Sequence, residues 1–257
     1  MADQRTVALF DEFVEFTRSF IVKHGLHYND YEAVLKYVIS VGEAGEWPLL
    51  MDVFFESTVN TVSYGEGDWT PSAIEGPYFK EGAPHIDAEP FALPMRPDEP
   101  GDRLEFLGGL HDADGTPVEG AVVDVWHSTN DGVYTFFSPR LPDEYLLRGK
   151  LTSDPDGAFR FRSVRPVPYE VPHDGPTGNL LNTVLGRHSW RPAHLHFRVQ
   201  APGYRTLVTQ LYFEGDPYLE SDSCTGVKNE LVVVPEKVEV DGEPYQRVAF
   251  DFVLQPS

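Results

Sequence analysis

The sequence predicts a mainly β protein, an antiparallel β-sandwich that follows an α-helical N-terminal region. The 257 residues include 22 Gly and 22 Pro, a content typical of short strands joined by many turns. The prolines are unevenly placed, because residues 1–65 contain only Pro48. Apolar residues recur with helical spacing before this point and with a spacing of two after about residue 100. We expect a helical dimerisation region and linker over residues 1–100 and a catalytic β-sandwich over residues 101–257.

The first helix is predicted between residues 7 and 21, where apolar residues form two stripes. One stripe contains Leu9, Phe13, Phe16 and Phe20, and the other contains Val7, Phe10, Val14 and Ile21. A helix that is apolar over so much of its surface usually buries two faces. The protein's own domain can cover one face, so the other is expected to meet a partner chain or a lipid-like guest. Further helices are predicted to begin near Asn29 or Asp30 and near Pro48.

Strands are predicted from alternating or short apolar runs. Those runs cover residues 104–110, 121–126, 159–162, 194–200, 207–213, 231–234 and 248–254. Residues 166–192 contain several turn formers and no clear period. This stretch is too long for an ordinary connection, and loops of that length are often functional.

Composition excludes several functional classes. The chain has 41 acidic and 20 basic residues, a formal charge of −21 and a pI of about 4.6. Nucleic acid and anionic membranes require a cationic surface, so neither is expected as a partner. A single cysteine, Cys224, excludes an internal disulfide or a thiolate metal cluster. Without a signal-peptide pattern or a long apolar run, we expect no membrane span and a cytoplasmic location.

His194 and His196 are the strongest local indication of chemistry. Residues i and i+2 of a strand point the same way, so both imidazoles share one face and Leu195 lies on the other. Two imidazoles at this spacing can chelate one metal ion, although they could also be polar residues on a solvated face. The preceding long loop, with Arg191 and Pro192 at its end, favours the metal site.

Two tyrosines could complete such a site. Tyr134 ends the sequence WHSTNDGVY, and Tyr169 lies among three prolines in RPVPYEVP. A trivalent cation would lower the high pKa of a tyrosine, and the resulting phenolate is a hard donor suited to ferric iron. The absence of thiolate partners argues against structural zinc, and no His-x-Asp or His-x-Glu pair indicates a ferrous site. Taken alone, each tyrosine is better explained as a structural residue than as a ligand.

Together with IEGPYF and RPAHLHFRV, these motifs resemble the intradiol ring-cleavage dioxygenases, which are non-haem ferric enzymes. The resemblance covers essentially the whole chain and is strongest to the chlorocatechol 1,2-dioxygenase branch. It implies one Fe(III) per subunit, held by Tyr134, Tyr169, His194 and His196 with a hydroxide at the fifth position. Tyr169 and His196 would be axial, and Tyr169 would leave the iron with a substrate proton. O2 would then open the catechol ring to a cis,cis-muconate.

The resemblance also implies further site residues. Arg191 would lie beside the bound ring and stabilise negative charge, and Gln210 would lie close to it. The positions that match the family's substrate pocket are Leu49, Val53, Ile74, Gly76, Pro77, Tyr78 and Cys224. A homodimer formed through the N-terminal helices is expected, with a phospholipid-like molecule near its interface.

Alternatives remain at this point. Val53, Ile74 and Cys224 would form a small apolar wall suited to a chlorinated ring, which favours chlorocatechol over catechol or hydroxyquinol. A β-sandwich binding module whose histidines bind nothing would contain no iron and have no colour. A zinc hydrolase that uses His194 and His196 would be colourless and active without O2.

Overall fold

The structure, a computed structural model, describes residues 3–142 and 144–257. It divides into two compact units, Met1–Trp47 and Pro48–Ser257. The sequence suggested a different division, at residue 100, between a region for dimerisation and linkage and a catalytic region. That division concerns function, and it stays a prediction. No helix among the described residues is both long enough and apolar enough to cross a membrane.

The first unit consists of two helices, α1 (Gln4–His24) and α2 (Tyr28–Ala44). Asp3 caps α1 by accepting hydrogen bonds from the backbone N–H groups of Arg5 and Thr6. Gly25 ends α1 with a φ of 59°, a left-handed conformation that glycine adopts without strain. The predicted helices are confirmed, and α2 begins slightly before Asn29 because His27 caps it together with Asp30. None of the α1 side chains is buried within the described chain.

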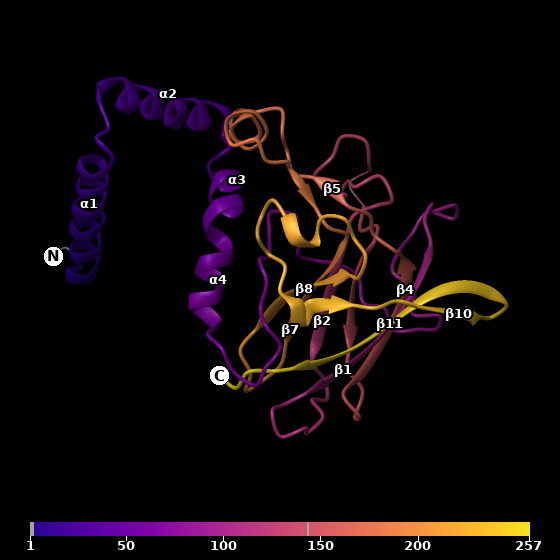
Figure 1. Cartoon of the computed structure of the whole chain (residues 1–257). Helices are drawn as coiled ribbons and strands as arrows, with labels where there is room; N and C mark the ends of the chain where they lie inside the picture. The colour runs from indigo at the N-terminus through magenta and orange to yellow at the C-terminus, as the bar shows by residue number, and fades with distance from the viewer. Residues whose placement is uncertain (1–2, 143) are drawn as a thin grey trace. The chain divides into compact units, whose positions relative to one another are not determined.

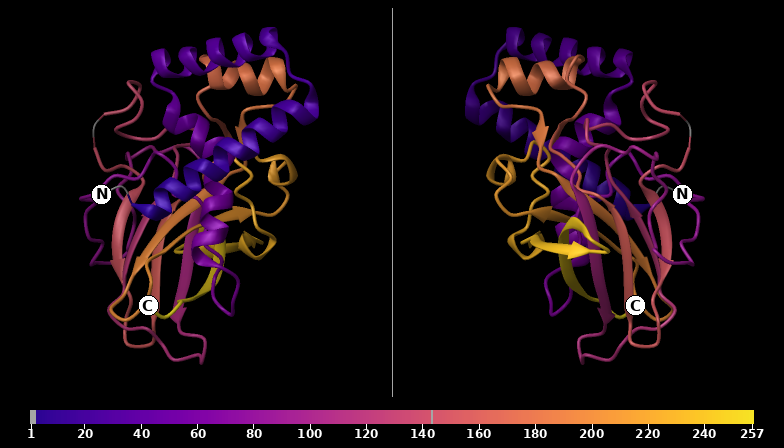
Figure 2. Two further views of the ribbon diagram at one scale, coloured as in Figure 1. Left: turned by 90° about the vertical axis from the view of Figure 1, so that its left-hand side faces the viewer. Right: turned by 90° about the vertical axis from the view of Figure 1, so that its right-hand side faces the viewer.

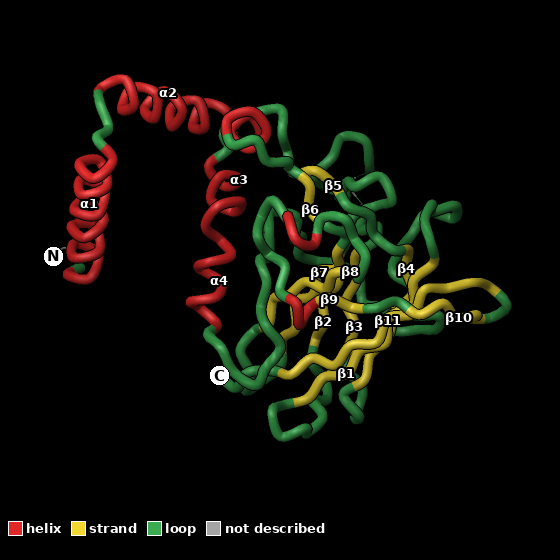
Figure 3. Tube along the Cα trace, viewed as in Figure 1, coloured by secondary structure: helices red, strands yellow, loops and turns green. Residues whose placement is uncertain are grey.

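A second helical segment begins at Trp47, the last residue of the first unit, and otherwise belongs to the other unit (Figure 3). It runs through α3 (Trp47–Met51), the π-helix η1 (Asp52–Glu56) and α4 (Ser57–Tyr64), and Pro48 lies in its first turn as predicted. Val53 is buried, and Ser57 Oγ donates a hydrogen bond to the carbonyl oxygen of Thr225. This segment therefore packs on the loop that contains Cys224.

Two sheets form the body of this unit (Figure 1). One has the order β3 (Arg148–Thr152), β2 (Val122–Trp126), β7 (His194–Gln200), β8 (Leu207–Phe213), β9 (Val232–Val233). The other has the order β10 (Glu236–Val240), β11 (Glu243–Val253), β1 (Arg103–His111), β4 (Ala158–Val164). Every predicted strand region contains a strand. The predicted sandwich is confirmed, and each sheet also contains one parallel pair, β1 with β11 and β8 with β9.

The core lies between the inner faces of the two sheets. Phe106 and Phe161 from one sheet and Phe197 from the other are completely buried, and the rings of Phe106 and Phe197 have centroids 5.0 Å apart. Burying each phenylalanine contributes roughly 1.5–3 kcal/mol. The core thus fixes the side of β7 on which Leu195 and Phe197 lie, and the alternating residues His194 and His196 must face the other way.

Residues 166–192 contain more structure than the sequence indicated. Strands β5 (Tyr169–Glu170) and β6 (Trp190–Arg191) pair with Tyr169 opposite Arg191. Between them lie α5 (Pro176–Asn179) and the π-helix η2 (Leu180–Val184). Both views in Figure 2 show this orange helical turn beyond one end of the sandwich strands. The β5–β6 pair therefore brings Tyr169 and Arg191 to the same place.

Candidate metal centre

Four donor side chains converge at the end of β7. The Nε2 atoms of His194 and His196 lie 3.1 Å apart, and the hydroxyl of Tyr134 lies 3.3 Å from His196 Nε2. The rings of Tyr134 and Tyr169 pack edge to face, with centroids 5.5 Å apart. The rings of Tyr169 and His194 have centroids 5.6 Å apart. All four predicted ligands thus meet in one cluster, and all four are buried.

Local backbone features orient these donors. His194 Nδ1 lies 2.7 Å from the carbonyl oxygen of Pro192, so Nδ1 carries the proton and Nε2 presents a lone pair. Gly132 adopts a φ of 75° in the turn before Tyr134, and a Cβ there would lie 2.7 Å from the Cβ of Tyr169. Only glycine therefore lets the two tyrosine segments approach this closely.

The electrostatics keep these groups neutral. Burial, followed by the charge of Arg191, lowers the pKa of His194 to about 3, and burial with the neighbouring His194 lowers the pKa of His196. Burial raises the pKa of both Tyr134 and Tyr169. A metal cation would favour the phenolate forms, and two phenolates with two imidazoles form a donor set for a hard trivalent ion. In the described part of the chain, no cluster of three or more His, Cys, Asp or Glu could hold a metal.

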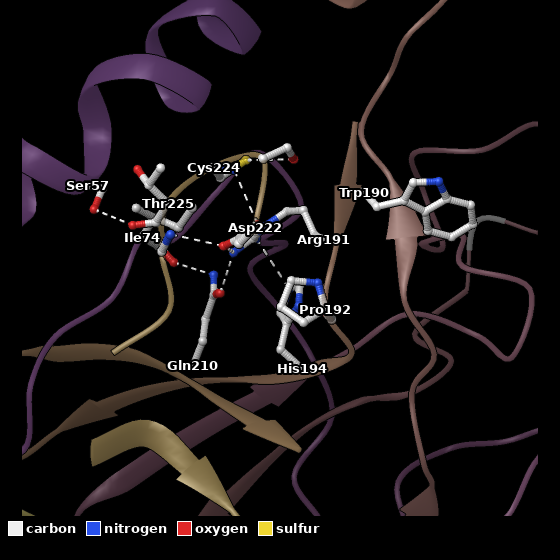
Figure 4. A network of polar contacts seen from close by, with 12 residues as sticks. Ser57, Ile74, Trp190, Arg191, Pro192, His194, Gln210, Asp222, Cys224 and Thr225 are labelled. Atoms are coloured by element: carbon white, nitrogen blue, oxygen red, sulfur yellow. Dashed lines mark hydrogen bonds and ion pairs between the residues drawn. The ribbon is translucent and has the colours of Figure 1, made fainter. Parts of the chain in front are cut away.

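Arg191 is held beside His194 by a buried ion pair (Figure 4). Its Nε donates to Asp222 Oδ1 at 3.1 Å, and its Nη2 donates to Gln210 Oε1 at 2.9 Å. Its Nη1 lies 3.4 Å from His194 Nε2. Asp222 also accepts hydrogen bonds from the backbone N–H groups of Cys224 and Gly226. One carboxylate therefore fixes both the guanidinium and the Cys224 loop.

The Gln210 side chain connects this cluster to the backbone before Gly76. Its Nε2 donates to the carbonyl oxygen of Ile74 at 2.6 Å, as Figure 4 shows. Its Oε1 accepts from the Tyr212 hydroxyl at 2.6 Å as well as from Arg191. Gln210 thus holds Ile74 and Arg191 in fixed positions relative to each other.

Most predicted pocket residues form an apolar wall. Val53, Ile74 and Cys224 pack in one buried cluster, with Leu49 against it. The sequence did not indicate the two further members of this cluster, Val171 and Leu181. Burial raises the pKa of the Cys224 thiol to about 11, so the side chain is neutral at physiological pH.

The three remaining residues predicted to line the pocket, Gly76, Pro77 and Tyr78, lie outside this apolar wall. Gly76 adopts a φ of 68°, and Pro77 is exposed. Tyr78 packs with the proposed ligands instead, since its ring stacks on Tyr134 at 4.4 Å with an interplanar angle of 16°. Tyr78, Tyr134 and Tyr169 line a cavity of about 350 Å³. This cavity gives the tyrosine side of the cluster an opening.

Comparison with known protein families decides the identity of the chain. The family described as "Dioxygenase" matches residues 74–256, and the one described as "Catechol dioxygenase N terminus" matches residues 3–66. The chain belongs to the intradiol dioxygenases. This family uses non-haem iron and cleaves catechol-type substrates with O2, so the resemblance seen in the motifs is confirmed.

Relatives of this dioxygenase are named after different substrates. It is 62% identical over 255 residues to the chlorocatechol 1,2-dioxygenase of Rhodococcus opacus, which covers 99% of both chains. The crystal structure of 3-chlorocatechol 1,2-dioxygenase from R. opacus 1CP matches with a TM-score of 0.90 at 40% identity, covering 98% of this chain and 99% of that one. Hydroxyquinol 1,2-dioxygenase from Pseudomonas putida DLL-E4 also has a TM-score of 0.90, at 32% identity, covering 100% and 94%. Backbone similarity alone therefore does not separate these substrates.

Proposed function

We propose that this intradiol dioxygenase cleaves chlorocatechols between the two hydroxylated carbons and forms chloro-cis,cis-muconates. The observation that carries the proposal is the convergence of the buried His194, His196, Tyr134 and Tyr169 beside an apolar wall. We further propose that the protein acts in the cytoplasm and in the degradation of aromatic or chloroaromatic compounds. The acidic composition gives no reason to expect nucleic acid as a partner.

The proposed ligands fit one ferric ion per subunit. His194 presents the lone pair of Nε2, and the two phenols can become hard anionic donors. When bound, ferric iron supplies the Lewis acidity that makes a chelated catecholate reactive toward O2. Zinc would not require two phenolate donors, which argues against the zinc-hydrolase alternative.

The chain's own residues supply proton transfer, charge and exclusion of water. As a phenolate, Tyr169 is proposed to accept a catechol proton at its oxygen and to become a neutral phenol. Arg191, held by Asp222 and Gln210, keeps a fixed positive charge beside the ring, an arrangement typically worth a few kcal/mol. The neutral wall of Val53, Ile74 and Cys224 excludes water from the substituent side.

The apolar wall also supports the choice among catechols. A chlorine substituent needs space and apolar contacts, whereas the third hydroxyl of hydroxyquinol needs a hydrogen-bond partner. Val53, Ile74 and Cys224 offer an apolar surface, and the buried Cys224 thiol is a weak donor. The relative named chlorocatechol 1,2-dioxygenase is 62% identical, against 35% for the hydroxyquinol 1,2-dioxygenase of Nocardioides simplex.

We also propose that the region 1–100 serves association and linkage, and that residues 101–257 hold the iron site. Phe10, Phe13 and Phe16 on α1 expose 65%, 64% and 68% of their surface. Exposed apolar area of this kind usually marks an interface. A homodimer through the N-terminal helices, with a phospholipid-like molecule at the interface, would cover it.

The decisive experiment combines a visible spectrum with product analysis. The iron-loaded protein should be red-brown from tyrosinate-to-iron charge transfer, and it should convert chlorocatechols to chloromuconates with consumption of O2. A colourless protein at full iron loading would refute the proposed ligand set. A non-catalytic binding module would neither show colour nor consume O2.

A further inference from the structure

Arg148 is a buried arginine that the proposed function does not use. It lies on β3 opposite Trp126 of β2, and only 1% of its surface is exposed. Burying a charge is costly unless the charge is paired and hydrogen-bonded. Such a residue therefore requires an explanation from its surroundings.

The contacts of Arg148 satisfy its hydrogen bonds without neutralising its charge. Nη1 donates to the carbonyl oxygen of Tyr78 at 2.6 Å, and Nε and Nη2 donate to Thr135 Oγ1 and to the Thr135 carbonyl oxygen. Among the residues that the structure describes, no carboxylate forms an ion pair with it. All three acceptors are uncharged.

The guanidinium instead lies over aromatic rings. Its central carbon is 5.7 Å from the ring centroid of Tyr134 and 5.6 Å from that of Phe137. Both distances are within the range of cation–π contacts. Phe137 is always neutral, so Tyr134 is the ring in this pair that can carry a counter-charge.

We propose that Arg148 is a positioning residue that sets the electron-donating strength of Tyr134 by holding a fixed positive charge over its ring. The inference rests on the proposed function, because it requires Tyr134 to be a phenolate ligand. The hydrogen bond to the Tyr78 carbonyl adds to this role, since the Tyr78 ring stacks on Tyr134. Arg148 thereby fixes both the charge over Tyr134 and the ring packed against it.

The charge has a spectroscopic consequence of definite sign. Charge transfer moves an electron from the Tyr134 ring to the iron and leaves the ring more positive. A cation near the ring raises the energy of that state, and low dielectric strengthens the effect. Arg148 should therefore hold the Tyr134 band at a shorter wavelength than an uncharged side chain would.

The test compares visible spectra of the iron-loaded full-length protein and its variants. Arg148→Met should move the charge-transfer band to longer wavelength, whereas Arg148→Lys, which keeps a charge, should stay near the wild-type position. Arg160→Met is the matched control, because Arg160 lies 5.2 Å from the ring of Phe91, which is not a proposed ligand. Its band should not move. If Arg148→Met does not fold, Arg148→Gln serves as the neutral variant, since it keeps hydrogen-bond donors.

A second background assigns the effect to one tyrosine. In Tyr169→Phe, Tyr134 is the only proposed phenolate donor, so Arg148→Met should still shift the remaining band. An unchanged band, equal shifts in the Lys and Met variants, or loss of the shift in the Tyr169→Phe background would overturn the inference. A colourless iron-loaded wild type would instead refute the proposed function, so the two failures are distinguishable.

Discussion

The Nε2 atoms of His194 and His196 lie 3.1 Å apart inside a cluster of buried side chains. His194 directs a lone pair into this space, because its Nδ1–H is hydrogen-bonded to the carbonyl oxygen of Pro192. Burial lowers the pKa of both imidazoles, so neither is protonated at neutral pH. Two uncharged imidazoles this close, with a phenol 3.3 Å from one of them, are arranged to share a cation.

The first prediction concerns iron retention. Tyr134→Phe and His194→Ala should each lower the affinity for iron by at least about tenfold or shift the charge-transfer band. Loss of a residue that merely hydrogen-bonds a metal ligand commonly lowers metal affinity by about tenfold or more, and loss of a ligand should have at least that effect. Metal analysis and the visible spectrum measure both effects. His24→Ala is the control, since His24 is an exposed residue in the last turn of α1 and should leave iron unaffected. Normal iron content and colour in both ligand variants would rule out the proposed site.

Tyr169→Phe should behave differently from the other ligand variants. It should keep part of its iron and lose turnover, because the phenolate oxygen of Tyr169 is proposed to accept the catechol proton. Iron content and O2 uptake, measured on the same preparation, separate the two properties. Turnover close to that of the wild type would contradict the role of Tyr169 as proton acceptor.

The sequence predicted which side chains of a strand face the core more reliably than it predicted which strands pair with each other. Alternation placed Leu195 and Phe197 in the core and His194 and His196 opposite them, as observed. Alternation carries no information on direction, so the parallel pairing of β1 with β11 could not be predicted. The short strand β3 was missed because Arg148 and Lys150 interrupt its apolar pattern.

The site shows the same limit. Family resemblance pointed to Tyr134 and Tyr169, which do meet, although 35 positions separate them in the sequence. Asp222 is one of 41 acidic residues and lies 31 positions from Arg191, so no local pattern marks it. Only the fold shows that this carboxylate is buried against the guanidinium.

The second prediction concerns Asp222. Asp222→Asn leaves the Arg191 charge buried without its counter-ion, which should cost about 3 kcal/mol of unfolding free energy and lower kcat/KM. Asp241→Asn is the matched control, because its pair with Arg162 is exposed and should contribute about 1 kcal/mol or less. Denaturant unfolding and steady-state kinetics measure both. Equal losses in the two variants would show that the buried pair has no special role.

The same carboxylate predicts a pH dependence. Burial raises the pKa of Asp222, but the Arg191 charge and the N–H groups of Gly226 and Cys224 outweigh burial and hold the pKa below 3.8. Its stabilising contribution is therefore complete at neutral pH and is lost as the pH falls through the lowered pKa. The difference in unfolding free energy between wild type and Asp222→Asn should be constant from pH 7 to about pH 5 and shrink below about pH 3.8. A difference that already disappears near neutral pH would contradict this assignment.

The third prediction concerns association through α1. The wild type should scatter light as a dimer of 28.9 kDa chains at micromolar concentration. The double variant Phe13→Glu/Phe16→Glu should be monomeric, because charges would replace the exposed apolar stripe. The control Glu12→Gln/Glu15→Gln changes two exposed acidic residues of the same helix and should remain dimeric. Mass spectrometry of an organic extract tests for the phospholipid-like guest, and a monomeric wild type would refute the interface.

The fourth prediction concerns substrate choice, measured as kcat/KM for catechol, 3-chlorocatechol, 4-chlorocatechol and hydroxyquinol. A chlorocatechol should be the best substrate, with catechol also accepted, because a methyl-sized change in an apolar pocket is worth only about 1–3 kcal/mol. Hydroxyquinol should be the poorest, since its third hydroxyl would be buried without a good partner. If hydroxyquinol were preferred by about tenfold, or 1.4 kcal/mol, the argument from the apolar wall would be wrong while the iron chemistry could stand.

Variants of the wall test whether Val53 and Cys224 themselves set this preference. Val53→Ala or Cys224→Ala enlarges the cluster that also contains Ile74, so the ratio of kcat/KM between chlorinated and plain catechol should change by about 5- to 150-fold, equivalent to 1–3 kcal/mol. Val59→Ala serves as the control, because Val59 lies on α4 of the same helical segment with 61% of its surface exposed. That variant should keep the wild-type ratio. A ratio that changes equally in all three variants would mean that helix stability, rather than contact with the substituent, controls the selectivity.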